Sequence, residues 1–455
     1  MLKTIAAIST PPGEAAIAIV RLSGTNAAVI AGQIFTPFIS GTSLNDLAGY
    51  RGILGKVYEG DTPVDEVVAF VYRAPKSYTG EDVVELCCHG GEYAAGKILR
   101  LLFEAGAIPA GPGEFTKRAY LNGKLDLTEA EAVMDLIGAS GRSAMRAALA
   151  AKDGALGKKI GGLTARLTDW SAHIAAWCDY PEEDLIPVDP AQLAKSLREI
   201  LSDMDDLLRG YDKGKIIRQG ASVAILGRPN VGKSTLMNLL TGQDSSIVTH
   251  LPGTTRDVVT ERINIGGIAL NLLDTAGIRE TDNLVEQEGV NRALAQLERA
   301  DIILAVFDRS QPLKEDDIRL IGLLKDANVI AIANKTDLPP AQSEEEISGR
   351  FNQVVGLSAA TGDGCEALEQ AVLTALNLTG EDPASPLIAN ERQRLCLQES
   401  ARSTQEALSA VESAQTLDAV GVCLDFALEA LLSLTGERVS EAVVEQVFAR
   451  FCVGK

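Results

Sequence analysis

The chain has 455 residues, too many for one hydrophobic core, so roughly two or three domains are expected. Hydrophobic residues make up 46% and charged residues 23% of it, a composition that excludes an intrinsically disordered chain. The net charge of −20 argues against a protein that coats nucleic acid without sequence preference, because phosphates attract cationic surfaces. Any contact with RNA must therefore rest on a local basic patch or on a partner.

The expected location follows from three features. No run of about 18 or more apolar residues occurs, so no segment is expected to span a membrane. The start, from Met1 to Ile5, lacks the apolar core of a signal peptide. Seven cysteines, an odd number, suit a reducing compartment better than a disulfide framework. Together these features predict a cytoplasmic protein.

The N-terminal region, residues 1–120, contains short apolar runs broken by glycine and proline. A helix is predicted over residues 91–104 from the spacing of its apolar residues. Strands are predicted over residues 16–20, 67–71 and 83–86. These elements indicate an α+β domain with a mixed or antiparallel sheet.

Two further blocks, residues 121–216 and 379–455, are rich in Ala, Leu, Glu, Asp and Lys. Their apolar spacing predicts long amphipathic helices. Because a different kind of sequence separates the blocks, they are predicted to form one helical domain into which another domain is inserted.

The inserted region, residues 217–378, alternates apolar runs of strand length with helix-length or loop-rich segments. Nearly continuous apolar strands that alternate with helices indicate a parallel, doubly wound sheet. Strands are predicted over residues 221–226, 268–273, 301–307, 329–333 and 353–357. The predicted fold class is therefore multidomain, with an α+β domain, an all-α domain and an inserted α/β domain.

A phosphate-binding loop is predicted at residues 227–234, whose sequence is Gly-Arg-Pro-Asn-Val-Gly-Lys-Ser. The loop follows a predicted strand and precedes a predicted helix over residues 235–240, the context that this motif requires. Its backbone amides are expected to wrap the β- and γ-phosphates of a nucleotide. Lys233 supplies a positive charge there, and the Ser234 hydroxyl is predicted to bind Mg²⁺.

Three more short motifs follow predicted strands. Asp274 can hold Mg²⁺ through water, and the amide of Gly277 can meet the γ-phosphate. Asp337, in the sequence Asn-Lys-Thr-Asp at 334–337, can accept two N–H groups of guanine that adenine lacks. Ser358 and Ala359 fit the loop that backs the guanine ring. Four motifs in this order, each after a strand, predict a GTP-binding domain.

The segment Gly253 to Asp257 lies between the phosphate loop and Asp274, where a switch segment is expected. Thr255 in it is predicted to supply the second hydroxyl ligand to Mg²⁺. The full set of residues predicted to bind GTP is Asn230, Val231, Gly232, Lys233, Ser234, Thr235, Thr249, His250, Leu251, Pro252, Gly253, Thr254, Thr255, Asp274, Thr275, Ala276, Gly277, Asn334, Lys335, Asp337, Ser358 and Ala359.

One position indicates how GTP is hydrolysed. Small signalling GTPases carry a Gln just after the Asp-x-x-Gly motif, where it orients the attacking water, and this chain has Ile278 there. The positive charge that stabilises the transferred phosphoryl group must come from an arginine finger or a bound cation. Asn230 can offer a carbonyl oxygen to a monovalent cation. Glu286 is a candidate for orienting the water, although spacing alone favours a solvated helix carboxylate at that position.

The assembled motifs resemble the MnmE (TrmE) family of tRNA-modification GTPases over essentially the whole chain. The resemblance is most specific outside the GTPase domain. At position 453 this chain has Val where the family commonly has Ile. The segments that carry the resemblance there are residues 10–13, 21–24, 77–82, 89–91, 112–116, 121–127 and 451–455.

For the GTPase domain, the resemblance implies activation by K⁺ and dimerisation of two such domains across the nucleotide. The cation then takes the place of an arginine finger, and charge near the transferred phosphoryl group is a large catalytic term. The matching positions are Ser234 and Thr255 for Mg²⁺, Glu286 for the attacking water, and Asn230, Thr249, Leu251 and Thr254 for K⁺.

For the N-terminal domain, the resemblance implies a homodimer that binds a tetrahydrofolate one-carbon donor in the 5,10-methylene or 5-formyl form. Arg21, Glu81, Lys124 and Lys455 match the folate-contacting positions. Arg and Lys suit the glutamyl carboxylates of folate, and Glu81 can accept N–H bonds from the pterin. Without the resemblance, each of these residues would be assigned as a surface charge.

The resemblance also implies a partner, MnmG (GidA), which carries the FAD and joins this protein in a heterotetramer. The two proteins together add an aminomethyl-type group, such as carboxymethylaminomethyl, to C5 of the wobble uridine of certain tRNAs. Cys452 matches the C-terminal cysteine of the family, which is implicated in that chemistry.

Two rival classes share the GTPase motifs. A ribosome-assembly or other RNA-binding GTPase without modification chemistry predicts a basic RNA-binding module, whereas this chain has a net charge of −20. A dynamin-like mechanical GTPase predicts a membrane-contacting tip, and the sequence has no amphipathic stretch of basic and aromatic residues. Both classes are disfavoured.

Overall fold

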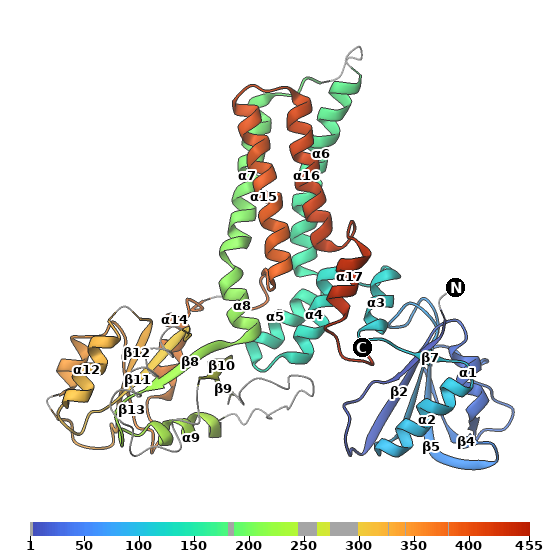
Figure 1. Ribbon diagram of the computed structural model, residues 1–455, viewed down its shortest axis with the longest axis horizontal. Helices are drawn as coiled ribbons and strands as arrows, with labels where there is room; N and C mark the ends of the chain where they lie inside the picture. The colour runs from blue at the N-terminus through green and yellow to red at the C-terminus, as the bar shows by residue number, and fades with distance from the viewer. Residues whose placement is uncertain are drawn as a thin grey trace. The chain divides into compact units, whose positions relative to one another are not determined.

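In the computed structural model of this chain, the described residues are 3–180, 186–243, 262–273, 299–325, 327–341, 343–380 and 382–455. They belong to two units, of which the first comprises Met1–Met134 with Leu428–Lys455 and the second comprises Asp135–Ala427. Figure 1 labels most of the helices and strands of both units. Each unit has its own hydrophobic core.

The first unit is built on a seven-stranded sheet. All neighbouring strands are antiparallel except β1 and β7, which are parallel, so the sheet is mixed. In spatial order the strands are β3 (Phe35–Pro37), β4 (Arg51–Glu59), β5 (Thr62–Tyr72), β6 (Val83–His89), β2 (Ile17–Ser23), β1 (Ile5–Ile8) and β7 (Ile108–Pro109). The α+β class predicted for this region is confirmed.

Helices α1 (Ala27–Ile34) and α2 (Glu92–Glu104) belong to the same unit and lie over its sheet (Figure 1). Residues of both helices share one apolar core with alternate residues of β2, β5 and β6. The buried side chains of α2 are spaced three and four apart, as expected for a helix with one apolar face. They are Ala95, Ile98, Leu101 and Leu102.

The C-terminal end of the chain packs within this first unit. Helices α3 (Glu114–Leu121), the start of α4 (Leu127–Gly138) and α17 (Glu441–Phe448) surround a small core that contains Phe448 and Phe451. Val453 then forms an antiparallel bridge with Pro112. The main-chain oxygen of Lys455 accepts a hydrogen bond of 3.1 Å from the amide of Phe115. The last residues therefore pack both on α17 and beside the segment 112–115 of the N-terminal region.

The second unit contains the helical part of the chain. α6, α7, α15 and α16 run side by side in Figure 1 and form a bundle. The side chain of Ser400 on α15 donates to the main-chain oxygen of Ala427 on α16, which ties these two helices together. The helices of this part are α5 (Arg142–Lys152), α6 (Ala155–Asp179), α7 (Pro190–Arg209), α8 (Tyr211–Gln219), α15 (Glu391–Glu412) and the first part of α16 (Leu417–Thr435), which continues into the first unit from Leu428.

The sequence explains where two of these helices begin. Asp189 caps α7 by accepting from the amide of Ala191, and Pro190 occupies the first helical position, where its missing N–H is not needed. Asn390 caps α15 by accepting from the amide of Gln393. The predicted long amphipathic helices are confirmed, and no helix in the described ranges is both long and apolar enough to cross a bilayer.

The described residues between these helical blocks form a six-stranded sheet in the order β13-β12-β11-β8-β10-β9. All neighbours are parallel except the β9–β10 hairpin. The sheet is confirmed as doubly wound and mostly parallel. Its elements are β8 (Ala221–Leu226), α9 (Lys233–Gln243), β9 (Arg262–Ile265), β10 (Ile268–Leu272), β11 (Ile302–Asp308), α12 (Glu315–Leu323), β12 (Val329–Asn334), α13 (Ser343–Ser348), β13 (Val354–Leu357) and α14 (Cys365–Ala375).

The segments that enter and leave this sheet pass very close to each other. A Cβ added to Gly214 in α8 would lie 2.5 Å from the main-chain oxygen of Ile388, so only glycine fits at the crossing. Such a contact between a segment before the sheet and one after it agrees with a domain inserted into the helical part. The exact residues at which the four predicted domains begin and end stay predictions.

Candidate functional site

Four parallel strands of the inserted sheet end at one edge. β13, β12, β11 and β8 are neighbours, and the register places Asp308 beside Asn334 and Asn334 beside Leu357. The phosphate-loop motif follows β8, and the motifs at 334–337 and 358–359 lie at the ends of β12 and β13. Because the carboxyl ends of parallel strands meet at the same edge, three motifs far apart in sequence come together there.

The phosphate loop depends on its two glycines. Gly227 and Gly232 have φ angles of 156° and 101°, which residues with side chains rarely adopt. A Cβ on Gly232 would lie 2.2 Å from Nδ2 of Asn334. Asn230 has a φ of 63°, in the left-handed region that Asn tolerates better than most residues. The two glycines and Asn230 therefore allow the positive φ angles of this loop. The missing side chain at Gly232 allows the loop to pack closely against Asn334.

The side chain of Lys233, near the end of the phosphate loop, folds back onto the start of that loop. Its Nζ donates to the main-chain oxygens of Gly227 and Arg228, each at 2.8 Å. Burial and the nearby Arg228 guanidinium lower the pKa of the Lys233 ammonium. A partly buried cation among carbonyl groups is well placed to bind an anion that enters the loop.

Asn334 ties the phosphate loop to the loop after β13. Its Nδ2 donates to the main-chain oxygen of Val231 at 2.8 Å, and its Oδ1 accepts from the amide of Ala359 at 3.0 Å. The residue is 1% exposed, so both ends of the amide are satisfied in the interior. In this geometry Asn334 links two parts of the predicted nucleotide site.

The residues predicted to contact guanine lie next to each other. The hydroxyl of Ser358 donates to Oδ1 of Asp337 at 2.6 Å, and Asp337 is exposed. Lys335 Nζ donates to the main-chain oxygen of Asn230 at 3.1 Å and to Oδ2 of Asp308 at 2.7 Å. Asp308 was not among the predicted site residues, although it directly follows a predicted strand at the same edge as the others.

The arginine of the phosphate loop also has partners that the sequence analysis did not foresee. Nε of Arg228 donates to Oδ2 of Asp317 at 3.0 Å, and both side chains are buried. Asp317 Oδ2 also accepts from the amide of Lys314 at the start of α12. An arginine already paired with a buried carboxylate supplies little free charge to a transferred phosphoryl group.

Several predicted GTP and metal residues lie outside the described residues. Ile278, at the position where small signalling GTPases carry Gln, is also outside them. The predicted roles of these residues stay predictions. They are Thr249, His250, Leu251, Pro252, Gly253, Thr254, Thr255, Asp274, Thr275, Ala276, Gly277 and Glu286.

In the first unit, Arg21 lies at the junction of the sheet with the C-terminal segment. Its Nε donates to Glu85 Oε1 at 2.8 Å, and its Nη1 donates to the main-chain oxygen of Gly454 at 3.4 Å. The guanidinium lies 5.5 Å from the ring centroid of Phe115 and 5.7 Å from that of Tyr78. Arg21 is therefore surrounded by aromatic rings and a carboxylate and does not extend freely into solvent.

Glu81 belongs to a buried polar network beside Arg21. Its Oε2 accepts from the Ser23 hydroxyl at 2.7 Å and from Arg118 Nη1 at 2.9 Å. Arg118 is 3% exposed and forms a second ion pair of 2.8 Å with Glu114. Arg118 was not among the predicted site residues, although a spacing of four residues from Glu114 in a helix brings the two side chains together.

The other residues predicted to bind folate lie around this network in the same unit. Nζ of Lys124 donates to the main-chain oxygen of Pro75 at 3.2 Å, in the segment that leads to Glu81. Burial and the Arg21 guanidinium lower the pKa of the Lys455 side chain. Cys452 is exposed, and its main-chain oxygen accepts from the amide of Gly113. The structure thus brings Arg21 and the two C-terminal residues to one part of the unit.

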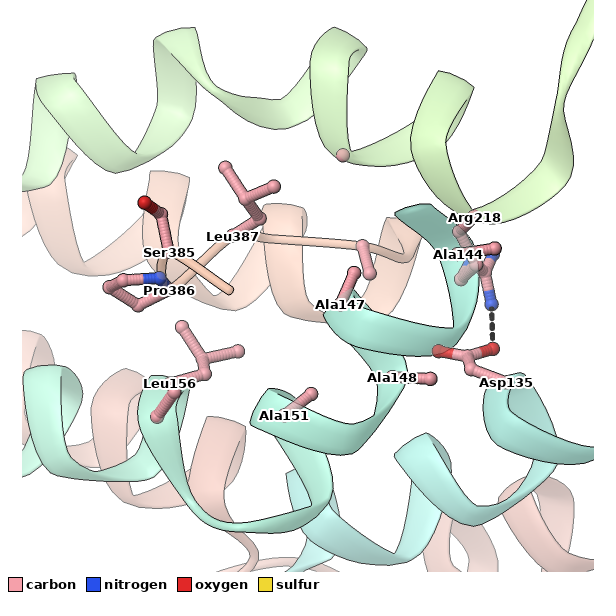
Figure 2. A pocket seen from close by; sticks show the side chains of 13 residues that line it. Asp135, Ala144, Ala147, Ala148, Ala151, Leu156, Arg218, Ser385, Pro386 and Leu387 are labelled. Carbon is pink, nitrogen blue, oxygen red and sulfur yellow. Dashed lines mark hydrogen bonds and ion pairs between the residues drawn. The ribbon is translucent and has the colours of Figure 1, made fainter. Parts of the chain in front are cut away.

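A separate small pocket lies in the second unit and is shown in Figure 2. α5, α8 and the segment 385–389 line it, mainly with alanine and other apolar side chains, and Asp135 and Arg218 form an ion pair of 2.8 Å there. Its volume is about 30 Å³. That is enough for roughly one water molecule and far too little for a nucleotide. None of the predicted site residues lines it.

Comparison with protein families gives two matches that together span nearly the whole chain. Residues 4–124 match the family described as the GTP-binding protein TrmE N-terminus, and residues 127–452 match the MnmE helical domain. The chain belongs to the MnmE (TrmE) family. It is a GTP-hydrolysing enzyme of tRNA modification. This assignment favours tRNA modification over the two rival GTPase classes.

Curated relatives of the MnmE family align over their full length. The tRNA modification GTPase MnmE of Geobacillus kaustophilus is 42% identical over 462 residues, which cover 99% of each chain. The protein of the same name from Bacillus subtilis is 41% identical over 461 residues, covering 100% of each chain. The solved FeoB G domain from Methanococcus jannaschii is 24% identical, covers 34% of this chain and 97% of that chain, and has a TM-score of 0.26. A TM-score this low supports no conclusion.

Proposed function

We propose that GTP binds at the sheet edge described above, with its phosphates in the loop 227–234 and its guanine beside Asp337. The link from Val231 through Asn334 to Ala359 supports this site, because it joins the phosphate loop to the loop that backs the base. Ser234 is exposed near the start of α9, where its hydroxyl is available to Mg²⁺ together with Thr255. Asp337 accepts the two guanine N–H groups.

In this proposal, K⁺ activates hydrolysis when two GTPase domains pair across the nucleotide. The main-chain oxygen of Asn230 already accepts from Lys335, so the exposed side chain of Asn230 is the part available to a cation. Thr249, Leu251 and Thr254 complete the proposed K⁺ site, and Glu286 orients the attacking water. The pairing of Arg228 with Asp317 supports a cation rather than an arginine of this loop as the source of positive charge.

The N-terminal unit is proposed to form a homodimer and to bind a tetrahydrofolate one-carbon donor through Arg21, Glu81, Lys124 and Lys455. Arg21 and Lys455 supply positive charge for the glutamyl carboxylates. The Glu81 carboxylate keeps 15% of its surface exposed beside Arg118, so it remains able to accept a pterin N–H. The two cations and the Glu81 carboxylate therefore fit a ligand that carries carboxylates at one end and a ring with N–H groups at the other.

The complete proposed activity is the addition of an aminomethyl-type group, such as carboxymethylaminomethyl, to C5 of the wobble uridine of tRNA. The FAD-carrying MnmG partner forms a heterotetramer with this chain in the cytoplasm. One observation carries the proposal beyond GTP hydrolysis. The hydrogen bond from Arg21 to the main-chain oxygen of Gly454 seats the C-terminal segment, with Cys452, beside the proposed folate residues. A one-carbon donor and a thiol then share one site.

The test is mass spectrometry of wobble uridines in tRNA from a strain that lacks this gene. We expect the C5-modified nucleosides to disappear and to return when the wild-type gene is restored. Restoration with Cys452→Ser separates the role of the thiol from that of the fold, since Cys452 is exposed and its replacement leaves the core intact. Unchanged wobble uridines in the deleted strain would refute the proposed activity.

A further inference from the structure

Asp308 lies at the carboxyl end of β11, next to the proposed nucleotide site. Its side chain is completely buried, and its Oδ2 lies 2.7 Å from Nζ of Lys335. Oδ1 accepts from both the amide and the hydroxyl of Ser310, at 3.0 and 2.6 Å. Both oxygens are therefore used, as a buried carboxylate requires.

The charge state of this carboxylate follows from these partners. Burial raises the pKa of the Asp308 carboxyl, but the hydrogen bonds from Lys335 and Ser310 outweigh burial and lower the pKa below its usual value. Asp308 is therefore ionised at neutral pH. It is a fixed negative charge on a rigid strand.

Lys335 connects its own loop after β12 with the end of β11 and with the phosphate loop. Its ammonium also donates to the main-chain oxygen of Asn230, so it links the end of β11 to the phosphate loop. Its backbone has a φ of 67°, an uncommon conformation for a lysine, which sets the direction of the side chain. A lysine whose head is held at two points presents its methylene stem as an ordered apolar surface.

We propose that Asp308 is a positioning residue for the guanine nucleotide: it fixes the Lys335 side chain so that the purine ring packs on the lysine stem beside Asp337. This proposal rests on the proposed guanine site. Without the carboxylate, the lysine head is free to move, and the nucleotide must order it again on binding. The consequence is weaker binding of GTP and GDP, with the chemical step itself unchanged.

The test is a double-mutant cycle with Asp308→Asn and Lys335→Met, read by the rate at which fluorescently labelled GDP leaves the full-length protein. Asp308→Asn is expected to speed release about tenfold and to raise KM for GTP by a similar factor, with kcat within about twofold. In the Lys335→Met background, Asp308→Asn is expected to add nothing. Asp301→Asn is the matched control, because Asp301 lies at the opposite end of β11 and caps the amide of Ser222.

The cycle and the kinetics can each overturn the proposal. If Asp308→Asn speeds GDP release by the same factor in the wild-type and in the Lys335→Met background, Asp308 acts on the fold and not through the lysine. A loss of kcat with unchanged KM indicates less folded enzyme and no positioning role. If Asp308→Asn alone does not fold, the double variant is compared with Lys335→Met. Equal release rates support the proposal, and faster release from the double variant overturns it.

A third variant separates this proposal from the site on which it rests. Asp337→Asn is expected to weaken GDP binding and to favour xanthosine diphosphate. If Asp337→Asn has no effect on that preference, the guanine site is wrong and the proposal falls with it. If Asp337→Asn has its effect and Asp308→Asn leaves GDP release within about twofold, the site stands and only the role of Asp308 is refuted.

Discussion

The side-chain Nδ2 of Asn334 donates to the main-chain oxygen of Val231 at 2.8 Å. This hydrogen bond joins the middle of the phosphate loop to the end of strand β12. The other end of the same amide accepts from Ala359. One buried side chain thus sets the spacing between the parts of the site proposed to hold phosphate and base.

Asn334→Ala is expected to weaken GDP binding because it removes both links at once. The carbonyl of Val231 and the amide of Ala359 then lose their buried partner, which costs about 1–3 kcal/mol for each group left unsatisfied. Calorimetric titration with GDP measures the affinity, and thermal unfolding measures the stability. Wild-type affinity in the variant would show that the link does not set the geometry of the site.

Gly232→Ala is expected to disrupt the phosphate loop. The new Cβ would lie 2.2 Å from Nδ2 of Asn334, and alanine at a φ of 101° is strained as well. Loss of GDP binding and a lower melting temperature should follow. The matched control is Gly242→Ala in helix α9, where a Cβ meets nothing within 4 Å and alanine favours the helix. Equal effects of the two changes would contradict this account.

Arg118→Met is expected to destabilise the first unit by about 3–5 kcal/mol, because it leaves Glu81 and Glu114 without their buried cation. Denaturant unfolding measures the change. Arg100→Met is the control, since Arg100 pairs with Glu104 at the surface with 71% of its side chain exposed. Such a pair contributes about 1 kcal/mol or less. A loss of stability from Arg118→Met no larger than that from Arg100→Met would show that the buried network is not stabilising.

The sequence predicted the inserted sheet well because its central strands are buried on both faces. The residues of β11 are all buried, and such a strand is an unbroken apolar run bounded by polar residues. β9 was not predicted, because its polar and apolar residues alternate over only four positions, too short a run to identify a strand. The adjacent Gly266 and Gly267, both with positive φ, are the hairpin signal that could have located it.

The candidate site was predicted only as far as local motifs extend. A motif names Lys233, Asn334 and Asp337 because nucleotide chemistry fixes their spacing. Asp308 and Asp317 act through contacts with residues 27 and 89 positions away, and no local pattern records such pairs. The hydrogen bond between Arg21 and Gly454 joins residues 433 apart. That hydrogen bond was not predicted. Only the family resemblance assigned Arg21 and Lys455 to one site, because local spacing carries no information about contacts between residues so far apart in the sequence.

Potassium is expected to raise GTP turnover strongly relative to sodium in wild-type protein. Asn230→Gly should abolish that difference with a much smaller effect on GDP binding, because glycine adopts the φ of 63° found there, and the change removes a cation ligand but keeps the main-chain oxygen that Lys335 contacts. Steady-state phosphate release in matched KCl and NaCl buffers provides the measurement. Equal turnover of the wild-type protein in the two salts would exclude a K⁺ site.

The proposed nucleotide site depends most on recognition of the guanine base by Asp337. The decisive measurement is competition between GDP and xanthosine diphosphate for the wild-type protein and for Asp337→Asn. In the variant, an amide N–H replaces a carboxylate oxygen and pairs with the extra carbonyl of xanthine. We expect the wild type to prefer GDP and the variant to prefer xanthosine diphosphate. The same preference in both proteins would contradict the proposed site.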